Sequence, residues 1–380
     1  MRLRKAPPRG AFFVMAGIYI HIPFCNSKCA YCGFYSIPSQ KRKAEFLEAL
    51  KQEMVSRKDY LHGEAVETIY FGGGTPSILK VEEIENLLGL IQEHYCVEAN
   101  AEITLEANPD TLSMEYLQGL RALGVNRLSI GIQSFFDDDL RYLSRRHDAG
   151  HARQCVQLAK DAGFDNISID LIYGLPTSNA DQWSRNLDLF FELEIPHLSA
   201  YALTLEPNSI LTKQIEMGKA LPVNEEDAVR DYEVLCRRAA ENGYLHYEIS
   251  NFCKPGKHSR HNSSYWFGIP YAGFGPSAHS FDGTSRQWNV ASLERYGESE
   301  REALSPEQIY DEYVMLRLRT LWGIDLKYMK REMGERFSDY CERQAEPLIA
   351  EGRLSRTREF LYLNDEQMLF ADGMAEALFY

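Results

Sequence analysis

Three cysteines stand within eight residues near the start of the chain, as Cys25, Cys29 and Cys32. Three thiolates from one loop can wrap a compact inorganic centre, and on a four-iron cluster they leave one iron open to an exogenous ligand. A structural zinc ion instead takes four protein ligands, and His21 is the nearest further candidate. The spacing therefore favours an iron–sulfur cluster, with a zinc site of three cysteines and one histidine as the alternative.

The composition of the chain excludes several classes of protein. Of its 380 residues, 44% are hydrophobic and 25% charged, which is the ordinary globular mixture. The formal net charge of −14 argues against a nucleic-acid-binding role, because phosphate binding requires a cationic surface. Five further cysteines occur singly, unlike those of a secreted disulfide scaffold, and this predicts a cytoplasmic protein. They are Cys96, Cys155, Cys236, Cys253 and Cys341.

The apolar run at residues 11–20 is too short to cross a membrane, since a spanning helix needs roughly 20 apolar residues. We therefore expect no transmembrane segment, although peripheral contact with a membrane is compatible with the sequence. Residues 1–15 are expected to form a flexible tail ahead of the first strand.

Short β-rich runs alternate with amphipathic stretches from residue 17 to residue 202. Such alternation predicts a parallel sheet, because each helical crossover lets the next strand run in the same direction. Six units predict an α/β fold, a partial (β/α)6 barrel over residues 16–245, with a doubly wound sheet as the alternative. The expected strands are 18–22, 68–71, 102–106, 127–132, 166–172 and 197–201. The expected helices are 42–60, 81–93, 114–123, 151–162 and 180–193.

Glycines and polar residues stand at the ends of these expected strands. The cysteine loop follows the first strand, and Gly73, Gly74, Thr75, Glu106 and Gln133 stand at the ends of the next three. Asp170 lies within the fifth strand, and Ala202 closes the sixth. In a parallel barrel all carboxyl ends of the strands meet at one rim, where active sites are built. We therefore expect these residues to converge on a single site.

The repeat stops beyond residue 203. A helix is expected at 225–242, and residues 246–304 form an extension rich in histidine and aromatic residues. Residues 305–380 predict a small, mostly helical, winged-helix-like C-terminal domain. Its expected helices are 306–321, 326–333, 335–351 and 371–378, and its expected strand pair is 352–354 with 359–363. The net charge of residues 306–380 is −5, which argues against DNA binding.

The motif Cys25-x3-Cys29-x2-Cys32 resembles the signature of the radical S-adenosylmethionine superfamily, in which this loop follows the first barrel strand. The resemblance implies that the open iron of a [4Fe-4S] cluster chelates the amino and carboxylate groups of S-adenosylmethionine. One electron from the reduced cluster would then cleave the sulfonium to an adenosyl radical. Chemistry of this kind belongs to the cofactor, while the protein supplies orientation and a dry site.

Four segments narrow the resemblance to the oxygen-independent coproporphyrinogen III oxidase group. They are 19–25, 71–77, 131–135 and 170–176, and the likeness extends from Met15 through the C-terminal domain. Residue by residue, the resemblance implies a defined set of contacts to S-adenosylmethionine. These are Tyr19, Tyr31, Gly73, Gly74, Thr75, Glu106, Gln133, Arg145, Asp170 and Ala202.

Two departures separate this chain from the oxidases of that group. The oxidases are similar to one another in a fourth cysteine two residues after the third, where this sequence has Phe34. They also carry an N-terminal extension over the active site, whereas only 17 residues precede the first expected strand here. Both departures argue against decarboxylation of coproporphyrinogen.

The segment 261–266 reads HNSSYW, and an HNxxYW motif resembles the heme chaperone branch of the group, HemW. The resemblance implies heme binding by His261, Asn262, Tyr265 and Trp266, with His261 as the axial ligand. Imidazole is a common ligand of heme iron, and aromatic rings offer flat apolar faces to the macrocycle. The neighbouring His258 and His279 are alternative ligands.

The sequence therefore predicts a heme chaperone that carries a [4Fe-4S] cluster and S-adenosylmethionine and delivers heme to an acceptor protein. The alternatives are an oxygen-independent coproporphyrinogen III oxidase and a zinc-stabilised barrel that binds another ligand. Whether the adenosyl radical is used productively is left open by the sequence. A homodimer formed on cluster loading is compatible with this interpretation.

Overall fold

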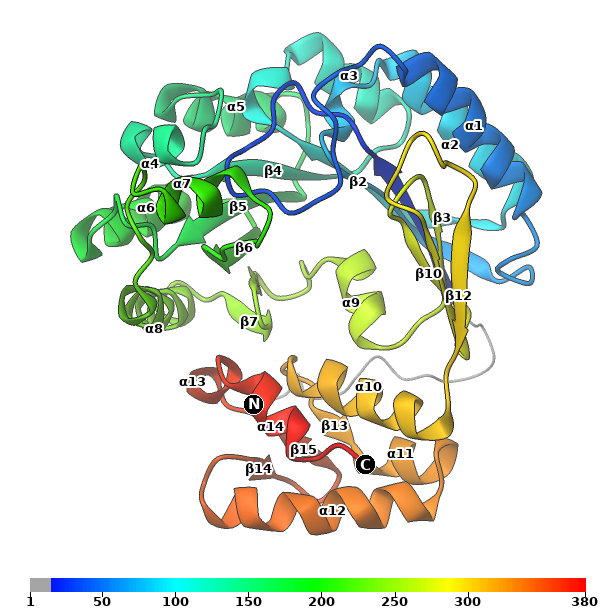
Figure 1. Ribbon diagram of the computed structural model, residues 1–380, viewed down its shortest axis with the longest axis vertical. Coiled ribbons are helices and arrows are strands. Elements are labelled where there is room, and N and C mark those ends of the chain that lie inside the picture. Colours follow the sequence, from blue (N-terminus) through cyan, green and yellow to red (C-terminus); the bar gives the residue numbers. More distant parts are fainter. Residues whose placement is uncertain (1–14) are drawn as a thin grey trace.

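The six predicted β-rich runs form six neighbouring parallel strands in a computed structural model that describes residues 15–380. Most of their side chains are buried, as expected for strands covered on both faces, although the start of β3 and the end of β6 are exposed. The sheet curves into an open barrel with helices along its outer side (Figure 1). The strands are β1 (Met15–Ile22), β2 (Ala65–Gly73), β3 (Val97–Ala107), β4 (Arg127–Gln133), β5 (Ile167–Tyr173) and β6 (His197–Ala202).

The covering helices bury one apolar stripe each against this sheet. In α2 (Val81–His94), for example, Ile84, Leu87, Leu88 and Ile91 recur at helical spacing and are buried. The remaining helices of this region are α1 (Lys43–Ser56), α3 (Met114–Ala122), α4 (Asp137–Tyr142), α5 (Ala149–Asp161), α6 (Ala180–Glu192), α7 (Ile210–Glu216) and α8 (Glu225–Glu241). The short helices α4 and α7 were not predicted, because fewer than two turns give no clear periodicity.

The segment after α8 extends the same sheet at both edges. Beyond β6 lie β8 (Asn251–Cys253) and β7 (Leu245–Glu248), and beyond β1 lie β9 (Tyr271–Phe274), β10 (His279–Phe281), β11 (Ser285–Asn289) and β12 (Ser299–Ala303). Only β9 runs parallel to its barrel neighbour, β1. The expected extension is therefore built into a twelve-stranded sheet, and α9 (Arg260–Trp266) connects its two edges.

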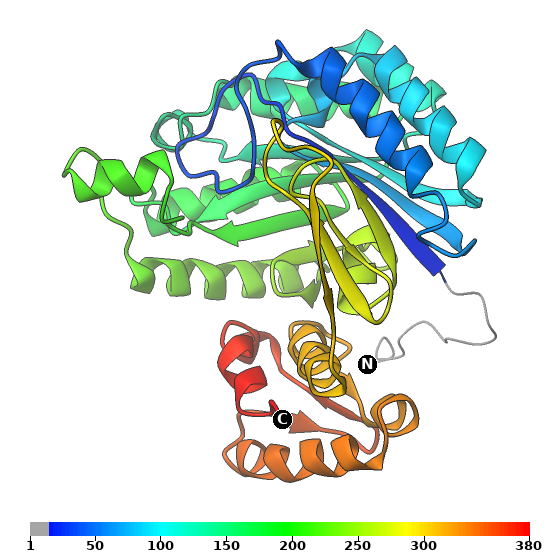
Figure 2. The same ribbon diagram turned by 45° about the vertical axis from the view of Figure 1, so that its right-hand side comes forward.

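The C-terminal residues form a separate small unit beside the barrel (Figure 2). Its own core includes Tyr310, Val314, Phe337 and Leu361. Its helices are α10 (Pro306–Leu318), α11 (Leu326–Glu332), α12 (Glu335–Ala350), α13 (Asp365–Met368) and α14 (Ala371–Glu376). Its strands form a three-stranded sheet in the order β13 (Ile324–Asp325), β15 (Phe360–Tyr362), β14 (Ser355–Arg356). The predicted strand 359–363 corresponds to β15, whereas β14 begins just after the predicted 352–354.

The two units meet through backbone and side-chain contacts. The Ile249 amide donates to the Arg319 carbonyl at 3.0 Å, and the Leu321 amide donates to the Tyr247 carbonyl at 3.1 Å. Trp322 packs against Tyr247 with ring centroids 6.2 Å apart. The C-terminal domain is thus docked on the β7 edge of the sheet and on α9.

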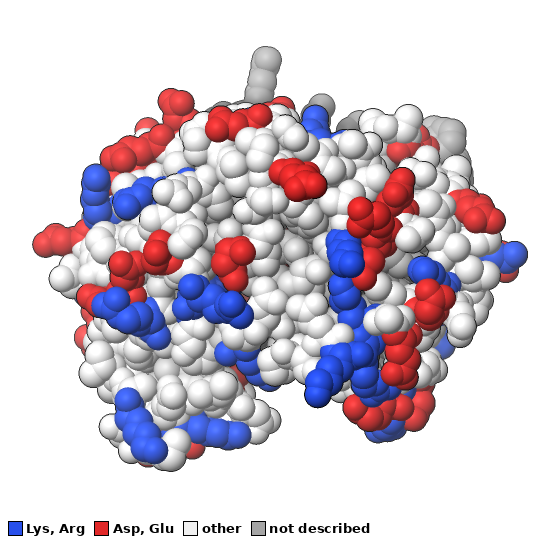
Figure 3. Space-filling model, turned by 90° about the horizontal axis from the view of Figure 1, so that it is seen from above, with Lys and Arg blue, Asp and Glu red and all other residues white. Residues whose placement is uncertain are grey.

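The α/β prediction of a partial (β/α)6 barrel with a mostly helical C-terminal domain is confirmed. The expected tail lies outside the described residues, except for Met15, which is the first residue of β1. Among the described helices, none is long and apolar enough to pass through a bilayer. Acidic and basic side chains are interspersed on the face seen from above (Figure 3).

Candidate functional site

The cysteine loop between β1 and α1 is held by backbone hydrogen bonds on two sides. The Cys25 amide donates to the Ile37 carbonyl at 3.1 Å, which closes the loop on itself. The Ala30 amide donates to the Leu143 carbonyl at 3.2 Å, and the Ala30 carbonyl accepts from the Leu211 amide at 2.8 Å. The loop is therefore fixed over the carboxyl ends of the strands, as the sequence predicted.

The three thiols of this loop line one cavity of about 380 Å³, which we call the thiol cavity. All three cysteines are free; Cys25 is buried, and Cys29 and Cys32 are half-buried. Arg145 donates a hydrogen bond to the Cys29 sulfur at 3.2 Å, which links the loop to the segment after α4. No three His, Cys, Asp or Glu side chains in residues 15–380 already surround a point where one metal ion could sit. The loop thus presents free thiols around a shared cavity.

The residues at the strand ends surround the same cavity. Of the ten residues implied to contact S-adenosylmethionine, nine line it. These are Tyr31, Gly73, Gly74, Thr75, Glu106, Gln133, Arg145, Asp170 and Ala202. The tenth, Tyr19, instead lines a second cavity, where its hydroxyl lies 3.1 Å from His21 Nδ1.

Close backbone approach shapes this rim. A Cβ on Gly74 would lie 2.6 Å from the Phe24 carbonyl oxygen, so β2 and the cysteine loop can pack this closely only at glycine. Gln133 has φ of 68°, in the left-handed region that side chains other than glycine rarely adopt. Such strain of about 1–3 kcal/mol is typical of binding sites. It turns the end of β4 toward the cavity.

Two carboxylates give the thiol cavity its electrostatic character. Burial raises the pKa of Glu106 to about 7, and the neighbouring Asp170 adds to this shift. Burial likewise raises the pKa of Asp170 to about 6. Glu106 accepts a hydrogen bond from the Tyr70 hydroxyl at 2.8 Å, and Asp170 accepts one from Ser129 at 3.3 Å. Both groups can therefore accept hydrogen bonds from a ligand near neutral pH.

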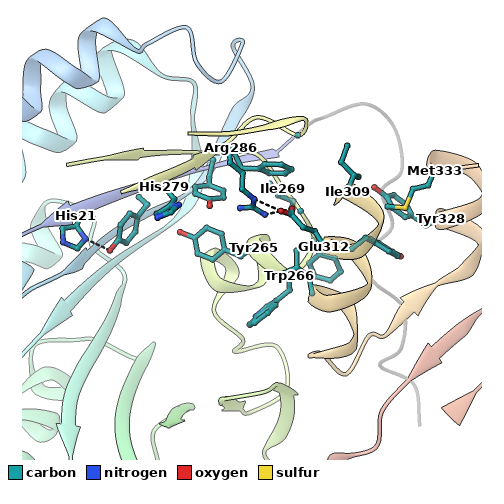
Figure 4. Close-up of a pocket in the computed structure, with 18 of the residues that line it drawn as sticks. His21, Tyr265, Trp266, Ile269, His279, Arg286, Ile309, Glu312, Tyr328 and Met333 are labelled. Carbon is teal, nitrogen blue, oxygen red and sulfur yellow. Dashed lines mark hydrogen bonds and ion pairs between the residues drawn. The ribbon is translucent and has the colours of Figure 1, made fainter. Parts of the chain in front are cut away.

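A second cavity of about 510 Å³ lies beside α9, between the β9–β11 edge of the sheet and the C-terminal domain (Figure 4). We call it the aromatic cavity, because its lining includes Tyr19, Phe34, Tyr265, Trp266, Phe267, Tyr271, Phe281, Tyr313 and Tyr328. Its volume falls within the usual range of about 300–1,000 Å³ for small-molecule and cofactor sites. In Figure 4, His21, His279 and Tyr265 lie toward the barrel end, and Tyr328 and Met333 toward the C-terminal domain.

An ion pair crosses the aromatic cavity from one unit to the other. Arg286 of β11 donates to the two carboxylate oxygens of Glu312 of α10, at 2.8 and 2.6 Å. The paired geometry is the bidentate form that arginine makes with carboxylates. Figure 4 shows this pair in the middle of the cavity. The wall of the cavity therefore depends on how the C-terminal domain is docked.

The HNxxYW residues divide between this cavity and the protein interior. Tyr265 and Trp266 line the cavity, whereas Asn262 and His261 do not. The His261 side chain is only 1% exposed, with Nδ1 2.8 Å from Thr68 Oγ1 and Nε2 2.8 Å from the Tyr265 hydroxyl. Burial, together with the charge of Arg127, lowers the pKa of His261 to about 3. Both of its ring nitrogens are engaged, so this conformation leaves neither free to bind iron, contrary to the expected axial role.

The alternative histidines also differ in position. His258 packs against the rings of Tyr247 and Trp322, with centroids 6.0 and 6.2 Å away, and lines neither cavity. His279 lines the aromatic cavity and is exposed. The structure thus brings one of the two alternatives to the site.

The comparisons with known proteins follow the same division of the chain. Residues 19–190 match the model of the radical SAM superfamily, and residues 304–370 match the HemN C-terminal domain. The heme chaperone HemW of Mycobacterium tuberculosis (strain CDC 1551 / Oshkosh) is 33% identical over 95% of this chain and 94% of its own. The chain belongs to the HemW family.

Further relatives agree with this membership. HemW of Bacillus subtilis (strain 168) is 34% identical over 94% of this chain and 97% of its own. Among solved structures, coproporphyrinogen III oxidase (HemN) from Escherichia coli, described as a radical SAM enzyme, is similar with a TM-score of 0.83. That similarity has 25% identity and covers 96% of this chain and 90% of the oxidase chain. This chain therefore shares its architecture with the oxidase.

Several residues of the two cavities were not predicted. Asn108 and Ser129 line the thiol cavity, and the place of Asn108 directly after β3 could have indicated it. Arg286 and Glu312 line the aromatic cavity, but no local pattern links a residue of β11 with one of the distant helix α10. Phe34 lines both cavities and is 69% exposed, at the position where the oxidases have their fourth cysteine.

Proposed function

We propose that this HemW-family chain is a heme chaperone that binds heme in the aromatic cavity and passes it to an acceptor protein. The observation that carries the proposal is a large aromatic cavity beside the HNxxYW helix, next to a separate thiol cavity that is lined by three cysteines. Two cavities can serve two ligands. Heme is cargo in this account, and the iron–sulfur cluster and S-adenosylmethionine are resident.

A [4Fe-4S] cluster would be held by the thiolates of Cys25, Cys29 and Cys32. The donor set fits, because three free cysteines of one anchored loop line the thiol cavity. When bound, the cluster supplies one-electron chemistry and an open iron. Arg145 donates to the Cys29 sulfur, and its hydrogen bonds to the Gly131 carbonyl and to Asn108, at 2.6 and 2.7 Å, keep the guanidinium in place.

S-adenosylmethionine would occupy the rest of the thiol cavity. Gly73 and Gly74 line the side of the cavity where its methionine end would lie. Glu106 and Asp170 can accept hydrogen bonds from the hydroxyl or ammonium groups of this ligand, and Tyr31 and Ala202 also line the cavity. These assignments follow the lining of the cavity.

Heme would lie in the aromatic cavity with its faces against Tyr265 and Trp266. Aromatic rings offer apolar contact to the macrocycle, and burial of such flat surface is favourable. Arg286 is the cation in the lining that can pair with a propionate, in competition with Glu312. Entry and release of heme then involve the contact between the sheet and the C-terminal domain.

The second candidate is the oxygen-independent coproporphyrinogen III oxidase reaction. The similarity in architecture to that enzyme favours it. Phe34 argues against it, because the oxidases are similar to one another in a cysteine at this position. The HNxxYW helix beside the aromatic cavity also supports the chaperone.

Anaerobic reconstitution with iron and sulfide tests the proposal. We expect the reconstituted protein to bind one heme per chain, measured by titration in the Soret region, while it retains its cluster. The same preparation, given S-adenosylmethionine, a reductant and coproporphyrinogen III, should form no protoporphyrinogen. Turnover above background would favour the oxidase, and zinc without iron and sulfide would favour the zinc-stabilised barrel.

A further inference from the structure

One histidine of the aromatic cavity is placed to reach a ligand. We propose that His279, and not His261, supplies the axial nitrogen to the iron of a heme in this cavity. The inference rests on the proposed heme-binding function and names the residue that recognises the iron. Among the described residues, two histidines line the cavity, His21 and His279.

The strand that carries His279 fixes its direction. Side chains alternate along a strand, so His279 and Phe281 share the cavity face of β10, and Ser280 points the other way. Ser280 accepts a hydrogen bond from Arg57 at 2.8 Å and one from the Gly273 amide at 2.9 Å, which anchors the strand from behind. On β11, Trp288 stands opposite His279, and the two rings stack with centroids 6.0 Å apart and planes at 25°. The imidazole is therefore oriented before any ligand arrives.

The competing imidazoles already have partners. His21 is 3% exposed, with Nδ1 3.1 Å from the Tyr19 hydroxyl and Nε2 2.9 Å from the Tyr35 carbonyl oxygen. His261 lies outside the lining and uses both nitrogens within the protein. His279 is exposed, and no residue of the described chain forms a hydrogen bond with its ring. Ligation by His279 breaks no existing hydrogen bond, whereas ligation by either of the others breaks at least one.

His261 then acts as a positioning residue. Its Nε2 is hydrogen-bonded to the Tyr265 hydroxyl, and its Nδ1 to Thr68, so it ties the cavity-facing ring of Tyr265 to β2. Its backbone amide also donates to Glu102 Oε1 at 3.1 Å, at the start of α9. Loss of this side chain should weaken heme binding without changing the iron ligand.

Heme titration of the reconstituted full chain tests the assignment through the spectrum. We expect His279→Ala to lower heme affinity by about tenfold or more and to remove the electron paramagnetic resonance signature of histidine ligation. Added imidazole should restore that signature, because it can enter the space left by the ring. His261→Ala should lower affinity by about threefold to tenfold but keep the wild-type signature. His258→Ala is the matched control and should leave both unchanged.

The outcomes separate the inference from the function on which it rests. If His261→Ala loses histidine ligation and regains it with imidazole, while His279→Ala keeps the wild-type signature, the ligand is His261 and the inference is wrong. The heme chaperone proposal survives that result. If the wild-type chain binds no heme, the proposed function itself fails, whatever the variants do.

Discussion

The thiol cavity and the aromatic cavity lie side by side but are built in different ways. The thiol cavity is formed by the cysteine loop, by the five consecutive strands β2 to β6 with the residues that follow them, and by Arg145, all within the parallel barrel. The aromatic cavity takes its walls from β1, the β9–β11 edge, α9 and the C-terminal domain. A barrel rim suits a resident cofactor that must be held precisely. A cavity whose walls come from two units suits a ligand that has to enter and leave.

The largest expected effect concerns the cluster, and it tests whether the cavities are separate. Cys29→Ala should abolish the iron–sulfur absorbance and iron binding, because two thiolates are not enough to hold the cluster. Heme affinity should stay within about threefold of wild type, since no cysteine lines the aromatic cavity. Metal analysis and heme titration measure the two properties.

The lone, exposed Cys96 provides the matched control for this change. Cys96→Ala should retain a full cluster. Normal iron and sulfide content in Cys29→Ala would contradict the assignment of the thiol cavity, and loss of heme binding in that variant would contradict the separation of the two cavities.

Glu106→Gln should change the stability of the fold and the binding of S-adenosylmethionine in opposite directions. The pKa of Glu106 in the folded protein, about 7, lies above its ordinary value of 4.5. The folded state therefore favours the protonated carboxyl, and this contribution to stability is fully present below pH 4.5 and is lost as the pH rises through 7. Because glutamine does not ionise, the cluster-free variant should be more stable than wild type at pH 8 by about 1–3 kcal/mol, a difference that shrinks toward pH 5. Denaturant unfolding at both pH values measures this difference.

The same variant should bind S-adenosylmethionine about tenfold more weakly, because a charged acceptor is lost. Glu115→Gln, on the exposed side of α3, is the control and should change neither property. A Glu106→Gln variant with wild-type affinity for S-adenosylmethionine would remove Glu106 from the binding site.

The ion pair across the aromatic cavity should make a smaller contribution. A double-mutant cycle of Arg286→Ala and Glu312→Ala should give a coupling free energy of unfolding of about 1 kcal/mol, since the pair is bidentate but about one quarter exposed. Without heme, this coupling reports the docking of the C-terminal domain. A coupling indistinguishable from zero would show that the pair does not hold the two units together.

The substitution Phe34→Ala should have the smallest effect on ligand binding, although Phe34 lines both cavities. Its side chain is 69% exposed, so Phe34→Ala removes little buried surface. We expect the affinities for heme and for S-adenosylmethionine each to change by less than about threefold. Parallel titrations measure both, and a large loss of both would indicate that the two cavities act as one site.

The thiol cavity could be predicted because its signals are local or periodic. The cysteine spacing is read within one loop, and residues such as Glu106 and Gln133 stand at strand ends that a parallel barrel must bring together. Tyr19 was the exception. It lies within β1 rather than at its end, and its side chain faces the other cavity.

The aromatic cavity could not be predicted to the same extent, because its strands are short and pair across long distances. The HNxxYW motif led to Tyr265 and Trp266, but the sequence could not show that His261 is buried between Thr68 and Tyr265. Burial and hydrogen-bond partners are tertiary properties, and they decide which histidine is free.

The most direct test of two cavities for two ligands is to quantify cluster and heme in the same anaerobically reconstituted sample. Iron, sulfide and heme should reach one [4Fe-4S] cluster and one heme per chain together, and the cluster spectrum should persist throughout the heme titration. Heme that binds only to cluster-free protein, or that displaces the cluster as it binds, would contradict the account.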